Sequence, residues 1–93
     1  MNPLENLRDE IDAVDAALVA LIQKRFEIAD RVIEVKRAKG IAASLPDRIE
    51  QVVQNALLNA RHTHVPPQTI EKLWRTLIAE TIAYEEKVLN AKQ

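Results

Sequence analysis

Several residue types are scarce or absent in this 93-residue chain. Cysteine is absent, which excludes a disulfide framework and thiol chemistry and is compatible with a reducing compartment. A single glycine supplies almost none of the tight turns that β-hairpins need. Aromatic residues make up only 3% of the chain, so the apolar fraction of 47% is almost entirely Ala, Leu, Ile and Val. This composition predicts an all-α protein.

The chain also lacks an excess of charge of either sign. Its formal net charge is −1, with both signs interspersed, so no basic surface points to nucleic acid or to an acidic membrane. No apolar run reaches the roughly 18 residues of a membrane-spanning helix, and the segment MNPLENLRDE has no apolar core of a secretion signal. We therefore expect a soluble, cytoplasmic protein without nucleic-acid or membrane partners.

The few helix-breaking residues divide the chain clearly. Gly40 follows a Lys/Arg-rich turn, as is typical of a helix C-terminus. Ser44 and Asp47 have the spacing of a capping box at the start of the next helix. Three helices are therefore expected, over about residues 3–39, 46–61 and 67–90.

A regular apolar stripe runs along the first predicted helix, with spacings that alternate between three and four residues. Its members are Leu4, Leu7, Ile11, Val14, Leu18, Leu21, Ile28, Val32 and Val35. A helix of about 36 residues is roughly 54 Å long, about twice the diameter of so small a domain. Two shorter helices cannot cover it, and each uncovered Å² costs about 25 cal/mol. We therefore predict one domain, residues 1–93, that forms a homodimer with its first helices paired.

One position of this stripe is charged. Arg25 stands between Leu21 and Ile28, where an apolar residue is expected. Lys36 lies 11 residues further on, about three turns, and so shares its face. An arginine in such an apolar stripe can simply extend its guanidinium to solvent, or it can specify how helices pair.

Other polar residues are placed where they could join Arg25. Arg48 lies in the first turn of the second helix, and Thr81 and Glu85 are i, i+4 neighbours on the third. Arg8 is 17 residues before Arg25, about 25 Å along the axis, and could reach the same site only from a second, antiparallel chain. Buried charges need partners, and few carboxylates lie near these arginines on the apolar stripe. The cluster therefore indicates a site for a dianionic ligand.

Four stretches of the chain match a known pattern: LRDEIDAVDAALVALIQKR, VKRAKG, LPDRIEQVV and LWRTLIAETIAYEE. Together they resemble the all-helical class of chorismate mutases, including the branch that contains isochorismate-pyruvate lyase. The first stretch is the most specific, because Leu-Arg-x-x-Ile-Asp-x-x-Asp followed by Leu-x-x-Lys-Arg rarely arises by chance. The resemblance covers nearly the whole chain. It implies an intertwined homodimer of three-helix chains with two equivalent sites.

The resemblance also implies the chemistry of each site. The substrate is a small dianion, chorismate or isochorismate, and its pericyclic reaction needs no nucleophile, metal or cofactor. Catalysis then consists of holding the compact, reactive conformer and aiming donors at the ether oxygen, where charge grows. Lys36 and Glu85 are the catalytic residues that the resemblance implies. The implied substrate-binding residues are Arg25, Arg48, Ile49, Thr81 and, from the partner subunit, Arg8.

Two departures from the family pattern keep alternatives open. Typical mutases carry carboxylates where this chain has Leu45 and Ile49, and an apolar residue cannot accept a hydrogen bond from a ring hydroxyl. This favours an isochorismate-pyruvate lyase that forms salicylate and pyruvate. Glu85 replaces the Gln of many bacterial members, and only a protonated Glu could donate to the ether oxygen. Chorismate mutase activity, which rearranges chorismate to prephenate, remains the first hypothesis, and the lyase is the alternative. A non-enzymatic helical dimerisation module is the third hypothesis; it would not depend on Arg25 or Lys36.

Overall fold

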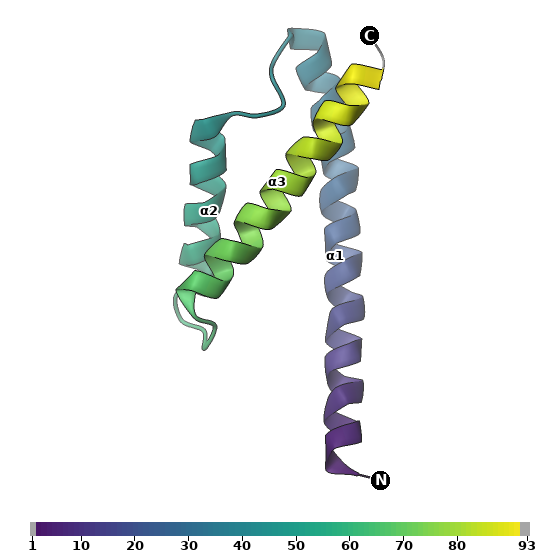
Figure 1. The fold of residues 1–93 in the computed structure, drawn as a ribbon, viewed down its shortest axis with the longest axis vertical. Coiled ribbons are helices and arrows are strands. Elements are labelled where there is room, and N and C mark those ends of the chain that lie inside the picture. Colours follow the sequence, from purple (N-terminus) through teal and green to yellow (C-terminus); the bar gives the residue numbers. More distant parts are fainter. Residues whose placement is uncertain (1, 92–93) are drawn as a thin grey trace.

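The computed structural model describes residues 2–91, and its regular structure is entirely helical (Figure 1). The helices are α1 (Pro3–Lys39), α2 (Pro46–Ala60) and α3 (Pro67–Ala91). The predicted all-α fold with three helices and a very long first helix is confirmed. None of the helices in the described part of the chain is long and apolar enough to cross a membrane.

Both ends of α1 are fixed by local chemistry. At its start, the side chain of Asn2 accepts a hydrogen bond from the backbone N–H of Leu4, at 2.8 Å, and Pro3 occupies the first helical position. At its end, Gly40 takes the left-handed conformation with φ 66° and ψ 33°. The backbone N–H of Ile41 then reaches the carbonyl of Lys36 at 2.8 Å, which satisfies the last turn. Gly40 ends the helix as predicted.

The predicted capping box at the start of α2 is wrong. The residue before the helix is Leu45 rather than Ser44, and no side chain caps the first turn. Pro46 is the reason, because a proline disfavours the helical conformation of the residue before it. Leu45 is accordingly extended, with φ −125° and ψ 98°. Asp47 still lies in the first turn, where a negative charge suits the helix dipole.

The three helices are arranged around α3. Figure 1 shows α2 and α3 as a helical hairpin, with α3 slanting across to the C-terminal half of α1. Helix α3 packs on both other helices, whereas α1 and α2 are in contact only through it. The largest fully buried side chains are Ile33 on α1 and Val53 on α2. This arrangement places the end of α1, the start of α2 and the middle of α3 around one space.

Polar clamps outside this space hold α3 to its neighbours. Arg75 of α3 donates two hydrogen bonds, at 2.8 and 2.9 Å, to the carboxylate of Glu50 on α2. Tyr84 of α3 donates a hydrogen bond to Asp30 of α1 and packs edge-on against the ring of Phe26. These contacts fix the register of α3 against both helices.

The N-terminal half of α1 extends beyond the other helices (Figure 1). Its apolar side chains are open in the single chain: Leu7 is 55% exposed, Val14 59% and Leu21 60%. A soluble monomer rarely exposes so long an apolar surface. The single chain therefore leaves this apolar stripe uncovered.

Candidate active site

A pocket of about 320 Å³ lies where the three helices converge. The C-terminal half of α1, the α1–α2 loop, the first two turns of α2 and the middle of α3 all contribute to its walls. Six of the seven predicted site residues line it: Arg25, Lys36, Arg48, Ile49, Thr81 and Glu85. Residues from segments far apart in sequence are thus brought together at one place.

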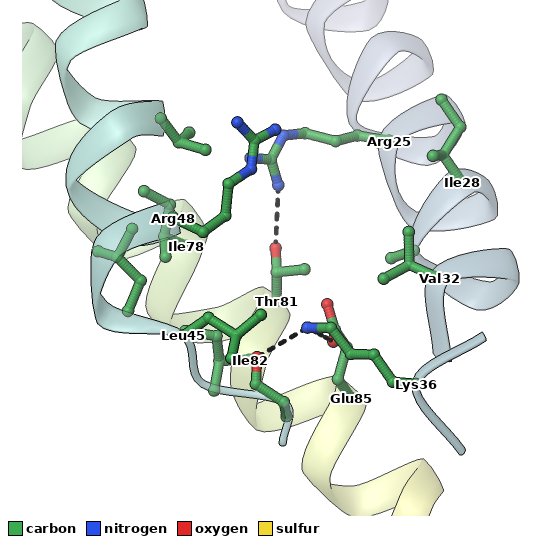
Figure 2. Close-up of a pocket in the computed structure, with 14 residues that line it drawn as sticks. Arg25, Ile28, Val32, Lys36, Leu45, Arg48, Ile78, Thr81, Ile82 and Glu85 are labelled. Atoms are coloured by element: carbon green, nitrogen blue, oxygen red, sulfur yellow. Dashed lines mark hydrogen bonds and ion pairs between the residues drawn. The ribbon is translucent and has the colours of Figure 1, made fainter. Parts of the chain in front are cut away.

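Arg25 points from α1 toward α3 (Figure 2). Its Nη1 donates to the hydroxyl of Thr81 at 3.2 Å, and that hydroxyl donates to the carbonyl of Leu77 at 2.7 Å. Burial lowers the pKa of Arg25 from its usual value, and the like charge of Arg48 lowers it further; Glu85 opposes both effects. A group whose charge is disfavoured in this way would gain from a bound anion.

Lys36 and Glu85 form the buried ion pair of the pocket. The ammonium of Lys36 lies 2.9 Å from Oε1 of Glu85, and the two side chains are 13% and 8% exposed. The ammonium also donates to the carbonyl of Ala43, in the α1–α2 loop, at 2.8 Å. Since an ammonium has three N–H groups, one remains for a ligand.

Arg48 completes the cationic side of the pocket. It lies in the first turn of α2, and Figure 2 shows its guanidinium and that of Arg25 meeting from opposite walls. Its Nη1 donates to Gln51 at 2.6 Å, and Gln51 is neutral. The lining has three cations and, in Glu85, one carboxylate, which gives it a formal charge of +2. A dianion would balance this charge.

Arg8 is the one predicted site residue that lies outside the pocket. It is exposed on the N-terminal half of α1, 17 residues and about 25 Å from Arg25 along the helix axis. A role in the pocket of its own chain is therefore ruled out by distance. The structure of one chain does not test the prediction that Arg8 serves the pocket of a second chain.

The rest of the lining is apolar. Leu45 and Ile49 lie on it, as the sequence suggested, together with Val52 of α2 and Ile82 of α3, which the sequence reasoning missed. Val52 follows Ile49 by one helical turn, so its place could have been read from the spacing. The carbonyl of Ala43 was also missed, and no sequence pattern marks a loop carbonyl. In the described residues, no cluster of three or more His, Cys, Asp or Glu side chains could hold a metal ion.

Comparison with known families agrees with this geometry. Residues 7–86 match the family model described as chorismate mutase type II. The chain belongs to this family. The matched range contains every residue of the pocket as well as Arg8. The finer assignment to an isochorismate-pyruvate lyase branch is not part of this match.

Individual relatives of this chain have different names. The 4-amino-4-deoxychorismate mutase of Streptomyces pristinaespiralis is 36% identical over 86 residues, which cover 92% of this chain and 67% of that protein. The T-protein of Enterobacter agglomerans is 37% identical over 82 residues, and that of Haemophilus influenzae is 32% identical over 87. The matched residues make up 88% and 94% of this chain in those two comparisons, but only 22% and 23% of the T-proteins. The chain thus spans less than a quarter of the T-proteins that it matches.

Proposed function

We propose that this protein catalyses the rearrangement of chorismate to prephenate. The observation that carries the proposal is the pocket itself, in which two guanidiniums and the Lys36–Glu85 pair face one cavity of about 320 Å³. Family membership supports it, and so does the match between a lining charge of +2 and a substrate with two carboxylates. In the reaction one C–O bond breaks and one C–C bond forms within the same molecule. No atom is gained or lost.

Binding the dianion in its folded conformer is the first task of the site. Planar guanidiniums bind carboxylates through two parallel hydrogen bonds, which fixes direction as well as position. Arg25 and Arg48 reach the cavity from opposite walls, so they can hold a flexible substrate at two points (Figure 2). In the proposed dimer, the partner subunit's Arg8 adds a third guanidinium. Holding the two reacting ends together removes the entropy cost of folding the substrate from the barrier.

Stabilising the ether oxygen is the second task. Negative charge grows on this oxygen as the C–O bond breaks, and a fixed donor in a water-poor pocket stabilises it well. Lys36 is held in place by Glu85 and by the loop carbonyl of Ala43, and it keeps one N–H for this oxygen. Glu85, when protonated, would be a second donor. Thr81 orients Arg25 through the 3.2 Å hydrogen bond between them.

A homodimer completes the proposed site. The exposed stripe on the N-terminal half of α1 needs a cover, and a second α1 has the matching apolar face. If the two first helices pair antiparallel, Arg8 of the partner subunit approaches the pocket of this chain. The same arrangement would give two equivalent sites per dimer.

An isochorismate-pyruvate lyase is the second candidate function, favoured by Leu45 and Ile49 in the lining. In that reaction the C–O bond breaks while a ring hydrogen moves to the enolpyruvyl methylene carbon, giving salicylate and pyruvate. The relatives named 4-amino-4-deoxychorismate mutases raise a third substrate. An ammonium on the ring would reduce the negative charge that the +2 lining can balance, so the pocket favours a dianion with a neutral ring.

Product analysis separates these possibilities. Purified protein is incubated with chorismate and, separately, with isochorismate, and products are identified by NMR. Prephenate from chorismate supports the proposal. Salicylate with pyruvate from isochorismate, and no prephenate, would establish the lyase. A non-enzymatic dimerisation module would form neither product.

A further inference from the structure

The centre of the contact between α1 and α3 is apolar. Ile33 of α1 is 1% exposed, and α3 is the helix that packs on α1. Apolar contacts have no preferred direction, so they hold the two helices together without fixing how α3 is rotated about its own axis. Directional polar contacts at the edges of this interface therefore set that rotation. On the edge that faces the pocket, one of them is the ion pair between Lys36 and Glu85.

A second polar contact lies on the opposite edge. The hydroxyl of Tyr84 on α3 donates a hydrogen bond to the carboxylate of Asp30 on α1. The ring of Tyr84 also packs edge-on against Phe26, with the ring centroids 5.2 Å apart. Asp30 is six residues before Lys36, which places it about 120° away around the axis of α1. Neither Asp30 nor Tyr84 lines the pocket, so α3 is held to α1 from both sides.

The two edges are linked through the backbone of α3. Tyr84 directly precedes Glu85, so a rotation of α3 that separates Tyr84 from Asp30 also moves Glu85 relative to Lys36. Arg37 lies on the same edge of α1 as Asp30, but its hydrogen bond to a backbone carbonyl of α3 is 3.5 Å long. A hydrogen bond of that length constrains the rotation only weakly. The bond between Tyr84 and Asp30 is thus the main directional contact of this edge.

Two further features keep this hydrogen bond in place. The bond to Asp30 raises the pKa of Tyr84, so the hydroxyl keeps its proton at neutral pH and remains a donor. Asp30 also lies two residues from both Ile28 and Val32, and is therefore roughly opposite the exposed apolar stripe on α1. A partner chain that covers the stripe leaves the contact between Tyr84 and Asp30 as it is in the single chain.

We propose that Tyr84 is a positioning residue of the active site. Its hydrogen bond to Asp30 holds α3 at the rotation in which Glu85 pairs with Lys36. The consequence for catalysis rests on the proposed function, in which Lys36 is the fixed donor to the ether oxygen. A donor that is less well fixed stabilises the developing charge less, so loss of the Tyr84 hydroxyl lowers kcat.

Binding of the substrate depends much less on this contact. The carboxylates are held by Arg25 and Arg48, which belong to α1 and α2 rather than to α3. Their long side chains can follow a bound carboxylate when α3 rotates slightly. A positioning role of Tyr84 therefore predicts a change in kcat with little change in KM.

Tyr84→Phe tests this prediction, because it removes the hydroxyl and keeps the ring beside Phe26. The kcat for chorismate should fall about five- to tenfold, the contribution of roughly one hydrogen bond, with KM within twofold of the wild type. Asp30→Ala should cause the same loss, whereas Asp30→Asn, which keeps an acceptor oxygen, should stay within twofold. Circular dichroism and urea denaturation confirm that each variant is folded under the assay conditions.

The double variant shows whether the two residues act as one unit. Tyr84→Phe combined with Asp30→Ala should be no slower than either single variant, because both changes remove the same hydrogen bond. An unchanged kcat in Tyr84→Phe, a loss confined to KM, or losses that add up in the double variant would overturn the proposal.

NMR of the Lys36 ammonium tests its position without any substrate. In protein labelled with ¹⁵N-lysine, the signal is assigned by its absence from Lys36→Arg. The bonds to Glu85 and to the carbonyl of Ala43 slow the exchange of its protons with water. Tyr84→Phe should speed this exchange at least threefold, and Asp30→Asn should not; equal exchange in wild type and Tyr84→Phe overturns the proposal. If the wild type does not convert chorismate, the proposed function fails while this measurement still decides the role of Tyr84, so the two failures are distinguishable.

Discussion

The ammonium of Lys36 lies 2.9 Å from the carboxylate of Glu85 and joins residues 49 positions apart in the chain. Both side chains are largely buried beside a cavity that two guanidiniums also face. The pair is therefore held in place before any ligand binds. Little free energy is then spent on moving these groups when charge develops on a ligand nearby.

Removal of the Lys36 ammonium should damage catalysis more than folding. Lys36→Ala is expected to lower kcat/KM for chorismate by about 10²–10³-fold, because it removes a fixed donor to the ether oxygen. Lys72→Ala removes the same charge from the exposed face of α3 and serves as the control. Near-normal activity of Lys36→Ala with a normal helical circular dichroism spectrum would contradict the assignment of Lys36 as the donor to the ether oxygen.

Complementation between two inactive variants tests whether the site is shared between chains. Arg8→Ala and Arg25→Ala should each be nearly inactive as homodimers. When they are unfolded together and refolded, half of the dimers are mixed, and each mixed dimer has one site with both arginines. Activity should return to about a quarter of that of the wild type, measured at equal dimer concentration. If mixed dimers form but remain inactive, Arg8 is not part of the partner's site.

The pH profile tests the role of Glu85. A carboxyl group can donate a hydrogen bond only when protonated, whereas an amide donates at any pH. If the group at position 85 donates to the ether oxygen, Glu85→Gln should therefore hold activity at pH 8 and show a flatter pH profile than the wild type. Glu80→Gln, on the exposed face of the same helix, should keep the wild-type profile. One shared profile for the wild type and Glu85→Gln would leave Lys36 as the sole donor to the ether oxygen.

The buried side chain of Ile33 should contribute strongly to the free energy of unfolding. Ile33 is 1% exposed and lies on α1 one turn before Lys36. Ile33→Ala should lower the free energy of unfolding by about 2–5 kcal/mol, and Ile33→Val by only about 0.5–1.5 kcal/mol. Urea denaturation at one fixed protein concentration measures both, since the midpoint of an oligomer depends on concentration. Equal losses for the two variants would contradict tight packing at this position.

Helix positions were predictable from the sequence because single residues decide them. Gly40 ends α1 through its left-handed conformation, and the apolar periodicity fixed the extent of all three helices. The start of α2 at residue 46 was predicted correctly, but the predicted capping box does not form, because the conformational restriction imposed by Pro46 outweighs the capping preference of Ser44.

The candidate site was predictable only where its side chains follow helical spacing. Arg25 stood out as a charge in an apolar stripe, and Thr81 and Glu85 as neighbours one turn apart. The hydrogen bond from Lys36 to the carbonyl of Ala43 could not be foreseen, because it depends on the path of the loop after Gly40. The pocket also depends on how α3 crosses α1, and periodicity within one helix carries no information about the angle between two.

Binding of a stable bicyclic ether dicarboxylate, shaped like the folded transition state, tests the central claim most directly. Transition-state mimics bind at least 10²-fold more tightly than substrates when a site is complementary to the transition state. Isothermal titration should give one molecule per chain, with a Kd at least 10²-fold below the KM for chorismate. Lys36→Ala and Arg25→Ala should each weaken this binding by 10²-fold or more. Failure to bind, or equal binding by wild type and Lys36→Ala, would contradict the account.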